Sequence, residues 1–390
     1  MTNLTFNAYA PTKVLFGAGK LNDLHGELHF GKKALLVLSN GKSAKTNGSL
    51  RRVEEQLADA GLTWILFDEI ESNPLSDTVM RGSETARKAN CDFIVALGGG
   101  SVIDAAKAIS VMATNDGEVW DYMSGGTGKG NAIKNAPLPL VAITTTAGTG
   151  SEVDASAVIT NAVTKEKMGI RTGFPALAVV DPELMLSVPP MFTAYQGFDA
   201  LFHSTEVYIS APANLLSDMV ASTSIKNIAK YLPCAVKDGN DLEARTHVAF
   251  ANTMSGYAMV FGACTGEHSM EHAMSAYHQN LPHGAGLIMI SKAYYEHVIA
   301  THTCDDRFIE MAKMMGIENA DKPEDFITTL VALQKACGVD NLKMSDYGIT
   351  PQEFGTLADN AFDTMGRLIS FERKPMTREE CIAIYEKSFR

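Results

Sequence analysis

Short apolar runs of strand length alternate with amphipathic segments over the first 183 residues of this 390-residue chain. Two of the intervening segments, 47–61 and 76–90, have the apolar spacing of helices. Strands that alternate with helices in this way favour a parallel sheet covered on both faces. The sequence therefore predicts an α/β domain, with strands expected at 33–39, 64–70, 92–100, 138–146 and 176–183.

The pattern changes at Pro189 and Pro190, which interrupt the chain. Beyond these prolines no strand pattern follows, and several expected helices open with Asp, Thr or Pro and close near Gly. A chain of 390 residues also exceeds one average core. We predict an α/β domain over residues 1–187 and an all-helical domain over residues 188–390.

Composition and charge exclude several classes of function. No apolar run approaches the roughly 18 residues that a membrane span requires, and the first residues lack the basic and apolar segments of a secretory signal. The formal net charge of −12 and the lack of a basic stripe argue against nucleic acid as a partner. The six cysteines form no CxxC pair, which indicates reduced thiols. We expect a soluble, cytoplasmic protein without membrane or nucleic-acid partners.

Three glycines, Gly98–Gly100, end the strand expected at 92–100 and precede a helical segment. Glycine lets the backbone turn sharply and approach a ligand closely, and Ser101 with Asp104 is expected to cap the helix. A helix N-terminus is an anion site, so a phosphate fits here. The turn alone is equally compatible with a structural role, because it matches neither the GxGxxG nor the Walker motif.

A second loop of small residues is expected over 144–161, directly after a strand. Loops at the carboxyl ends of parallel strands gather over one edge of the sheet, where ligands bind. Two such loops favour a nucleotide site, in which hydroxyl and ammonium groups would contact phosphate or ribose oxygens. The candidate side chains are Thr144, Thr145, Thr149 and either Lys165 or Lys167.

Four of the ten histidines stand between residues 266 and 286. His268 and His272 are four residues apart on an expected helix, and Asp199 and His203 have the same spacing on another, so that each pair projects from one helix face. His283 follows in a Pro-His-Gly turn. A lone histidine on a helix is more often a packing residue, but two such pairs and a turn histidine are difficult to explain in that way.

Imidazole nitrogen and carboxylate oxygen are ligands of divalent metals such as Zn(II) and Fe(II). Three histidines and one aspartate leave the cation a net charge of about +1 and a place for one exogenous oxygen, which is typical of a catalytic site. None of these candidate ligands is a cysteine, which weakens the case for a structural zinc site.

Two long segments carry the candidate metal ligands, VVDPELMLSVPPMFTAYQGFDALFHSTEVYIS and EHSMEHAMSAYHQNLPHGAGLIM. They resemble the two signature regions of the iron-containing (group III) alcohol dehydrogenases, relatives of lactaldehyde reductase and 1,3-propanediol dehydrogenase. The pieces NP, GGGSVID, TTAGTGSEV and TKEK fall in the expected order, so the likeness covers essentially the whole chain. The resemblance implies a Rossmann-like, dehydroquinate synthase-like N-terminal domain that binds a dinucleotide and a helical domain that binds metal.

The resemblance also implies a role for each matching residue. The residues that match the metal ligands are Asp199, His203, His268 and His283, with Fe(II) as the metal and Zn(II) as the alternative. His272 matches a catalytic residue that is proposed to relay protons beside the nicotinamide. The residues that match positions cradling the dinucleotide are Asn73, Gly99, Gly100, Ser101, Asp104, Thr144, Thr145, Thr149 and Lys167.

Three departures from the family pattern matter. Phe198 replaces the usual Met, which should not affect the ligands, and the stretch before His283 is one residue longer, which makes His278 a rival ligand. Ser39 stands where many NAD-dependent members carry an Asp, whose carboxylate accepts from the ribose 2′-OH. With Lys42 close by, Ser39 is a cofactor-binding candidate that predicts NADP(H) in preference to NAD(H).

The implied function is the interconversion of a small primary alcohol or diol and its aldehyde, with hydride transfer to or from NAD(P)(H). The resemblance further implies a homo-oligomer and a site in the cleft between the two domains. Two alternatives stay open. One is a glycerol dehydrogenase-like or dehydroquinate synthase-like enzyme of the same two-domain plan. The other is a non-catalytic protein that binds metal and nucleotide.

Overall fold

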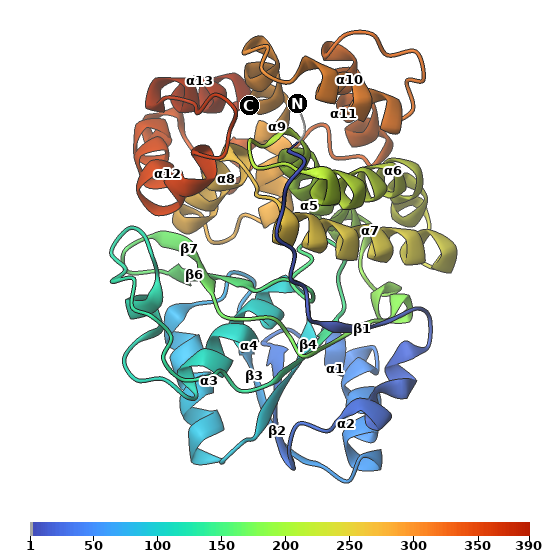
Figure 1. The fold of residues 1–390 in the computed structure, drawn as a ribbon, viewed down its shortest axis with the longest axis vertical. Coiled ribbons are helices and arrows are strands. Elements are labelled where there is room, and N and C mark those ends of the chain that lie inside the picture. The colour runs from blue at the N-terminus through green and yellow to red at the C-terminus, as the bar shows by residue number, and fades with distance from the viewer. Residues whose placement is uncertain (1–2) are drawn as a thin grey trace. The chain divides into compact units, whose positions relative to one another are not determined.

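The structure, a computed structural model, describes residues 3–390 (Figure 1). The chain divides into two compact units. The α/β unit consists of residues 10–146 and 150–187, and the helical unit consists of residues 188–390 together with residues 3–9 and 147–149. The short segment 147–149 thus belongs to the helical unit, although the chain on both sides of it belongs to the α/β unit.

The α/β unit contains a six-stranded parallel sheet of order β1-β8-β5-β4-β2-β3. Its strands are β1 (Lys13–Phe16), β2 (Lys33–Ser39), β3 (Thr63–Ile70), β4 (Phe93–Gly98), β5 (Leu140–Thr144) and β8 (Leu177–Val180). The five predicted strands are confirmed at nearly the same bounds. Strand β1 is not among them, because its four residues at the edge of the sheet give only a short apolar pattern.

The central strands are buried on both faces, as a parallel sheet requires. On one face Leu36, Val95 and Ile143 form a core with the short 3-10 helix η1 (Lys20–Glu27) and helix α2 (Ser49–Asp59). Helices α3 (Ser76–Lys88) and α4 (Gly100–Met112) pack together against strands β3, β4 and β5. The short helix α1 (Ser43–Thr46) follows β2.

An antiparallel hairpin, β6 (Ser156–Asn161) and β7 (Glu166–Arg171), packs on helix α4. The expectation of a loop over 144–161 is therefore wrong from Ser156 onward. Lys107 of α4 holds the segment that leads into β6. Its buried Nζ donates to Ser151 Oγ at 2.9 Å and to Ser156 O at 2.7 Å. The hairpin thus depends on a contact distant in sequence, which the local pattern does not reveal.

The helical unit contains helices and turns but no sheet over residues 188–390, as predicted. Its helices are α5 (Pro190–Ile209), α6 (Leu215–Lys237), α7 (Leu242–Phe261), α8 (Gly266–Tyr277), α9 (His283–Ala300), α10 (Asp305–Met314), α11 (Glu324–Ala336), α12 (Phe354–Ile369) and α13 (Arg378–Ser388). Pro190 is the first residue of α5, where its missing N–H costs nothing. Helix α9 packs on both α5 and α8.

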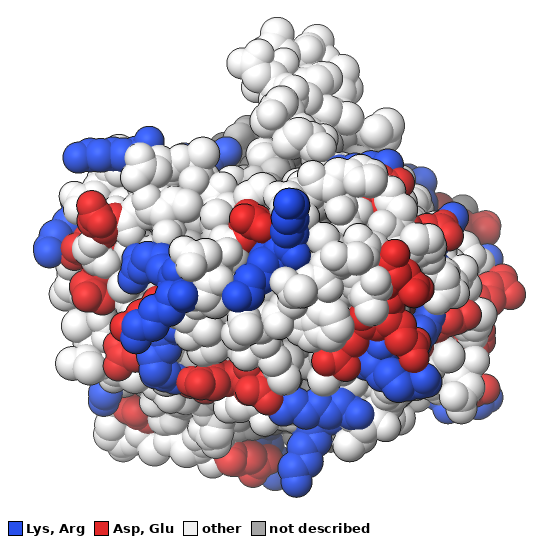
Figure 2. Space-filling view, turned by 90° about the horizontal axis from the view of Figure 1, so that it is seen from below, with Lys and Arg blue, Asp and Glu red and all other residues white. Residues whose placement is uncertain are grey.

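No helix in the described part of the chain is both long and apolar enough to span a membrane. On the face shown in Figure 2, Lys and Arg side chains lie interspersed with Asp and Glu side chains. This face therefore offers no continuous basic surface of the kind that a nucleic-acid backbone requires.

Candidate metal centre and cofactor-binding loops

Helix α5 carries three polar side chains, Asp199, His203 and Glu206, at intervals of four and three residues. This spacing places them on one face of the helix. All three are buried, with exposed fractions of 4%, 6% and 0%. Because an unpaired buried charge is costly, these groups need partners from the neighbouring helices.

Helix α8 supplies the first partner. Glu206 Oε2 lies 2.6 Å from His268 Nδ1, and His268 Nε2 lies 3.5 Å from Asp199 Oδ1. Because the carboxylate accepts from Nδ1–H, Nε2 faces Asp199 and is the nitrogen that can bind a cation once it has lost its proton.

Helix α9 supplies the second partner, His283, which lies between a glutamate and Asp199 as His268 does. His283 is the first residue of α9, after Pro282 at the N-cap. Its Nδ1 contacts Glu271 Oε2, and its Nε2 lies 3.5 Å from Asp199 Oδ1. Two imidazoles are thus each anchored by a carboxylate on one nitrogen and directed to the same aspartate oxygen by the other.

The donor atoms have the spacing of metal ligands. Asp199 Oδ1 lies 3.5 Å from Nδ1 of His203 and 3.5 Å from Nε2 of His268 and of His283. Two ligands bound at about 2.1 Å to a tetrahedral cation are separated by about 3.4 Å. Asp199 Oδ1 and His268 Nε2 are buried without a hydrogen-bond partner among the described residues, a cost that a cation would offset. Asp199, His268 and His283 therefore fit a divalent metal as one group, and His203 shares no such group with Asp199 among the described residues.

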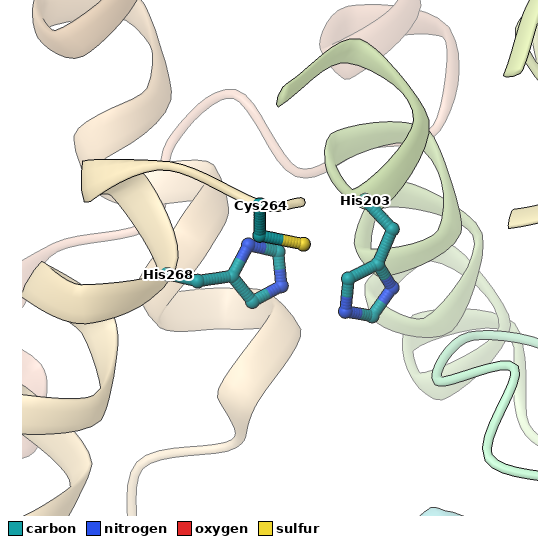
Figure 3. A group of neighbouring side chains, drawn as sticks. All are labelled: His203, Cys264 and His268. Atoms are coloured by element: carbon teal, nitrogen blue, oxygen red, sulfur yellow. The ribbon is translucent and has the colours of Figure 1, made fainter. Parts of the chain in front are cut away.

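His203 lies differently from the other two histidines. Its Nδ1 lies 3.3 Å from Gly148 O, and its ring stacks on that of His268 with centroids 4.3 Å apart. The donor atoms of His203, His268 and Cys264 all lie within 4.8 Å of one another (Figure 3). Cys264 therefore lies beside two of the candidate ligands, although the candidate ligand set itself contains no cysteine.

Gly148 lies against helix α5 at the point where a side chain would not fit. A Cβ at this position would lie 2.9 Å from Gln196 O and 3.1 Å from Asp199 Oδ2. The side chain of Gln196 also accepts from Ala147 N at 3.2 Å. The segment 147–149 therefore belongs to the surroundings of the metal ligands, and the predicted cofactor residue Thr149 lies in it.

Burial and neighbouring charges set the pKa values at this centre. Burial opposes the charge on Asp199, but His203, His283 and His268 hold its pKa below the usual range. Burial lowers the pKa of His203 to about 3. Burial also disfavours the charge on His268, but the carboxylates of Glu206 and Asp199 raise its pKa to about 10. The centre therefore combines an anionic carboxylate with a neutral imidazole at His203.

The remaining histidines of the sequence motif separate into two groups. His272 is buried, and its ring centroid lies 5.3 Å from that of His283. His278 Nε2 instead lies 3.2 Å from Glu353 Oε1, and His278 belongs to no metal-binding group among the described residues. His278 as a rival ligand is therefore wrong, because it pairs with a carboxylate elsewhere.

Glu206, Glu271, Cys264 and Gly148 are site residues that the sequence prediction lacks. A helical-wheel argument could have found Glu206, which lies seven residues after Asp199 on the same helix face. Glu271 lies on α8 three residues after His268, at a spacing that also shares a face. Nothing in the local sequence indicates Cys264 or Gly148, because both reach the ligands through tertiary packing.

In the α/β unit, the glycine turn lies where parallel sheets bind ligands. The strand order reverses between β2 and β4, and ligands bind outside the carboxyl ends of the strands at such a point. Gly98 pairs in register with Thr144, and Thr145 N donates to Gly98 O at 3.0 Å. A Cβ on Gly99 would lie 2.8 Å from the side chain of Thr146, so this close approach requires glycine.

Other predicted cofactor residues lie near this turn or contact one another. Ser39 ends strand β2, which is adjacent to β4. Lys167 Nζ donates to Asn73 Oδ1 at 3.2 Å, and Ser101 Oγ donates to Ser72 O. These contacts link the loop after β3, the first turn of α4 and strand β7 within one unit.

The expected cap of α4 by Ser101 and Asp104 is wrong. The helix begins at Gly100, after Gly99 at the N-cap, and no side chain caps it. Asp104 instead accepts from Ser151 Oγ and, at 2.8 Å, from Val158 N, so it fastens the hairpin to α4. Burial raises the pKa of Asp104 to about 6.

Comparison with known proteins identifies the family. A model described as iron-containing alcohol dehydrogenase matches residues 11–182, and one described as Fe-containing alcohol dehydrogenase family, C-terminal, matches residues 193–389. Alcohol dehydrogenase 4 of Saccharomyces cerevisiae is 34% identical over 386 residues, which cover 98% of each chain. The 1,3-propanediol dehydrogenase of Klebsiella pneumoniae is 32% identical over 399 residues, which cover all of both chains.

Solved structures agree with this assignment. The crystal structure of an archaeal halo-thermophilic Red Sea brine pool alcohol dehydrogenase has a TM-score of 0.94 at 31% identity, with all of both chains covered. A 1,3-propanediol oxidoreductase has a TM-score of 0.89 at 30% identity, with 99% of this chain and 100% of that chain covered. With one carboxylate and three imidazoles gathered on three helices and both family models matched, the chain belongs to the iron-containing alcohol dehydrogenases.

Proposed function

We propose that this protein is a metal-dependent alcohol dehydrogenase that transfers a hydride between NAD(P)(H) and a small primary alcohol or diol and its aldehyde. The observation that carries the proposal is the convergence of three imidazoles at 3.5 Å from Asp199 Oδ1. A 1,3-propanediol dehydrogenase, a methanol dehydrogenase and a butanol dehydrogenase among the relatives support a small alcohol as the substrate.

The metal ligands in this proposal are Asp199, His203, His268 and His283, with Fe(II) as the metal and Zn(II) as the alternative. When bound, the cation supplies Lewis acidity toward the substrate oxygen, and the nicotinamide exchanges the hydride. Asp199 contributes the single negative charge among the four ligands. Glu206 and Glu271 each fix one imidazole, which keeps the donor nitrogens directed toward Asp199 before metal arrives.

His272 is the catalytic proton carrier in this proposal. It lies on α8 one turn beyond His268, and its ring stands 5.3 Å from that of His283. An imidazole that is adjacent to the ligands without being one of them can accept the alcohol proton and return it during aldehyde reduction. Burial keeps this proton transfer away from bulk water.

The dinucleotide in this proposal binds at the carboxyl ends of β2, β4 and β5. The N-terminus of α4 provides backbone N–H groups for the phosphates, and Gly99 and Gly100 let the backbone approach them. The other proposed cofactor residues are Ser39, Asn73, Ser101, Asp104, Thr144, Thr145, Thr149 and Lys167. Residues 1–187 would thus form the dinucleotide-binding domain and residues 188–390 the metal-binding domain.

We further propose NADP(H) as the preferred dinucleotide. Strand β2 ends in Ser39, so the strand provides no carboxylate there to accept from the ribose 2′-OH or to repel a 2′-phosphate. Two relatives are named for the other cofactor, an NAD-dependent methanol dehydrogenase of Bacillus methanolicus and a probable NADH-dependent butanol dehydrogenase 1 of Bacillus subtilis. A direct comparison of NADPH and NADH therefore tests this point.

The proposal also includes a homo-oligomer that works in the cytoplasm. Exposed apolar side chains on helices α5 and α6 support assembly, with Phe192, Leu215 and Met219 exposed by 49%, 53% and 57%. Light scattering during size-exclusion chromatography measures the assembly.

The decisive experiment is anaerobic purification and elemental analysis, followed by assays of aldehyde-dependent oxidation of NADPH and NADH side by side. Steady turnover that is lost in His268→Ala, with nucleotide binding retained, supports the proposal. Unchanged turnover in His268→Ala rejects the metal ligand set. Bound metal and nucleotide without any turnover would indicate a non-catalytic binding protein.

A further inference from the structure

Cys264 lies in the turn before helix α8 with its sulfur close to two of the metal ligands. Its exposed fraction is 7%, and it forms no disulfide. Figure 3 shows the sulfur beside the ring of His268 and directed toward His203. The three donor atoms lie within 4.8 Å of one another, close enough for small movements to bring them onto one ion.

Among the described residues, the helical unit contains three overlapping sets of donors. Asp199, His268 and His283 form the first set, His203, Cys264 and His268 form the second, and Glu271, His272 and His283 form the third. His268 belongs to the first two, and its Nδ1 is held by Glu206, so only its Nε2 is available to a cation. One nitrogen cannot serve two cations, so occupation of the first set excludes occupation of the second.

We propose that His203, Cys264 and His268 form a second, thiolate-containing binding mode for a thiophilic divalent cation, Zn(II) above all. Two imidazoles with one thiolate are a ligand set that zinc accepts in proteins, whereas oxygen donors such as Asp199 suit harder cations. On binding, the Cys264 thiol gives its proton to solvent and its sulfur becomes the third ligand. The imidazole of His268 contributes Nε2, which is buried and has no hydrogen-bond partner among the described residues, so this mode uses the same nitrogen as the set that contains Asp199.

The consequence rests on the function proposed above. A cation held by Cys264 would occupy Nε2 of His268 and would thereby withhold this ligand from the catalytic cation. Thiophilic metals therefore inhibit by competition with the catalytic metal for His268. In this proposal Cys264 is a metal ligand, whereas buried cysteines usually pack as small apolar residues.

The test uses Cd(II) as a thiophilic probe on the full-length, metal-free protein. One equivalent is added anaerobically, and thiolate-to-cadmium charge-transfer absorption is recorded in the ultraviolet. We expect the band in the wild type, its loss in Cys264→Ser and Cys264→Ala, and its retention in Cys337→Ser. Cys337 is a matched control because its exposed fraction is 6% and it belongs to no metal-binding group among the described residues.

Bound cadmium without the band in the wild type overturns the inference, as does a band that survives in both Cys264 variants. Circular dichroism of the two Cys264 variants separates loss of the ligand from loss of the fold. The outcome is independent of the proposed activity, because the band can be present in a protein that oxidises no NAD(P)H. Conversely, if the protein is an active dehydrogenase but gives no band, the proposed function stands and only the second binding mode is overturned.

Discussion

Glu206 accepts hydrogen bonds from both the backbone and the ring of His268. Its Oε1 lies 3.0 Å from His268 N, and its Oε2 lies 2.6 Å from His268 Nδ1. The backbone N–H of Thr265 donates to the same Oε2 at 3.3 Å. One carboxylate on α5 therefore fixes the first turn of α8 and the orientation of the His268 ring, and it leaves Nε2 as the nitrogen that can bind metal.

Glu206→Gln is expected to lower the affinity of the metal-free protein for its cation by about 10- to 100-fold. The amide has one acceptor oxygen where the carboxylate has two, so it cannot serve all three donors, and it removes the charge that favours a cation. Competition with a chelator of known affinity measures the change.

Glu353→Gln is the matched control for this variant. Glu353 also pairs with a histidine, His278, but this pair lies outside the metal-binding groups of the described residues. Its variant is expected to bind metal as the wild type does. Equal metal affinity in both variants would show that Glu206 does not position the ligand.

Gly284→Ala is expected to destabilise the protein and to weaken metal binding together. A Cβ at Gly284 would lie 2.1 Å from Tyr195 O, so the start of α9 must move away from α5 and carry His283 with it. Overpacking of this kind costs about 1–3 kcal/mol. Thermal denaturation with and without metal measures both effects.

Gly366→Ala provides the comparison, because a Cβ on this helical glycine meets nothing within 4 Å. Alanine there is expected to leave metal binding unchanged and to stabilise α12 by up to about 1 kcal/mol. Wild-type metal affinity in Gly284→Ala would mean that α9 absorbs the added group without moving His283.

The local apolar pattern was sufficient to predict those strands and helices whose burial is reflected in their own residues. The apolar run 33–39 matches strand β2 at both ends, because a buried strand of a parallel sheet is continuously apolar. The hairpin β6–β7 does not have such a run, and it depends on Lys107 and Asp104 of α4, which are distant in the sequence. Such a contact leaves no local signal.

The same distinction applies to the candidate site. The spacing of Asp199 and His203 is a property of one helix, so the sequence predicts that they share a face. Glu206 and Glu271 determine which nitrogen of His268 and of His283 faces the aspartate. Their helix faces follow from the sequence, but these pairings are known only from the packing of three helices. The nearness of Cys264 to the histidines likewise follows from the path of the turn before α8.

Glu372 is expected to make the protein less stable as the pH rises from about 5 to about 7. Burial raises its pKa from the ordinary value of 4.5 to about 7, so the folded protein holds a proton that the unfolded chain has lost. Stability falls with pH wherever the folded state binds more protons, and the whole shift corresponds to about 3 kcal/mol. Denaturation melts across this pH range measure the slope.

Glu372→Gln is expected to flatten this slope, since glutamine does not titrate. The variant loses one acceptor oxygen, which lowers the free energy of unfolding by a similar amount at every pH. The test therefore compares how the free energy of unfolding changes with pH, and not its absolute value. Glu318→Gln changes an exposed glutamate and should retain the wild-type slope. An unchanged slope in Glu372→Gln would assign the pH dependence to other groups.

Ser39→Asp is expected to change the preferred dinucleotide from NADPH to NADH. The new carboxylate stands at the carboxyl end of β2, beside β4 and its glycine turn, where it can accept from a ribose 2′-OH and repel a 2′-phosphate. A loss of about 1.4 kcal/mol in binding NADPH corresponds to about tenfold in affinity, and we expect at least this. The ratio of kcat/KM for the two dinucleotides measures the change.

Ser39→Asn is the control for size, because it adds nearly the same volume without the charge. If the asparagine variant changes the ratio as much as the aspartate variant does, bulk at the end of β2 decides the preference instead of charge. A wild type that already prefers NADH would contradict the proposed preference for NADP(H). In that case Ser39 Oγ or another group accepts from the 2′-OH, and Ser39→Asp would increase the preference for NADH instead of reversing it.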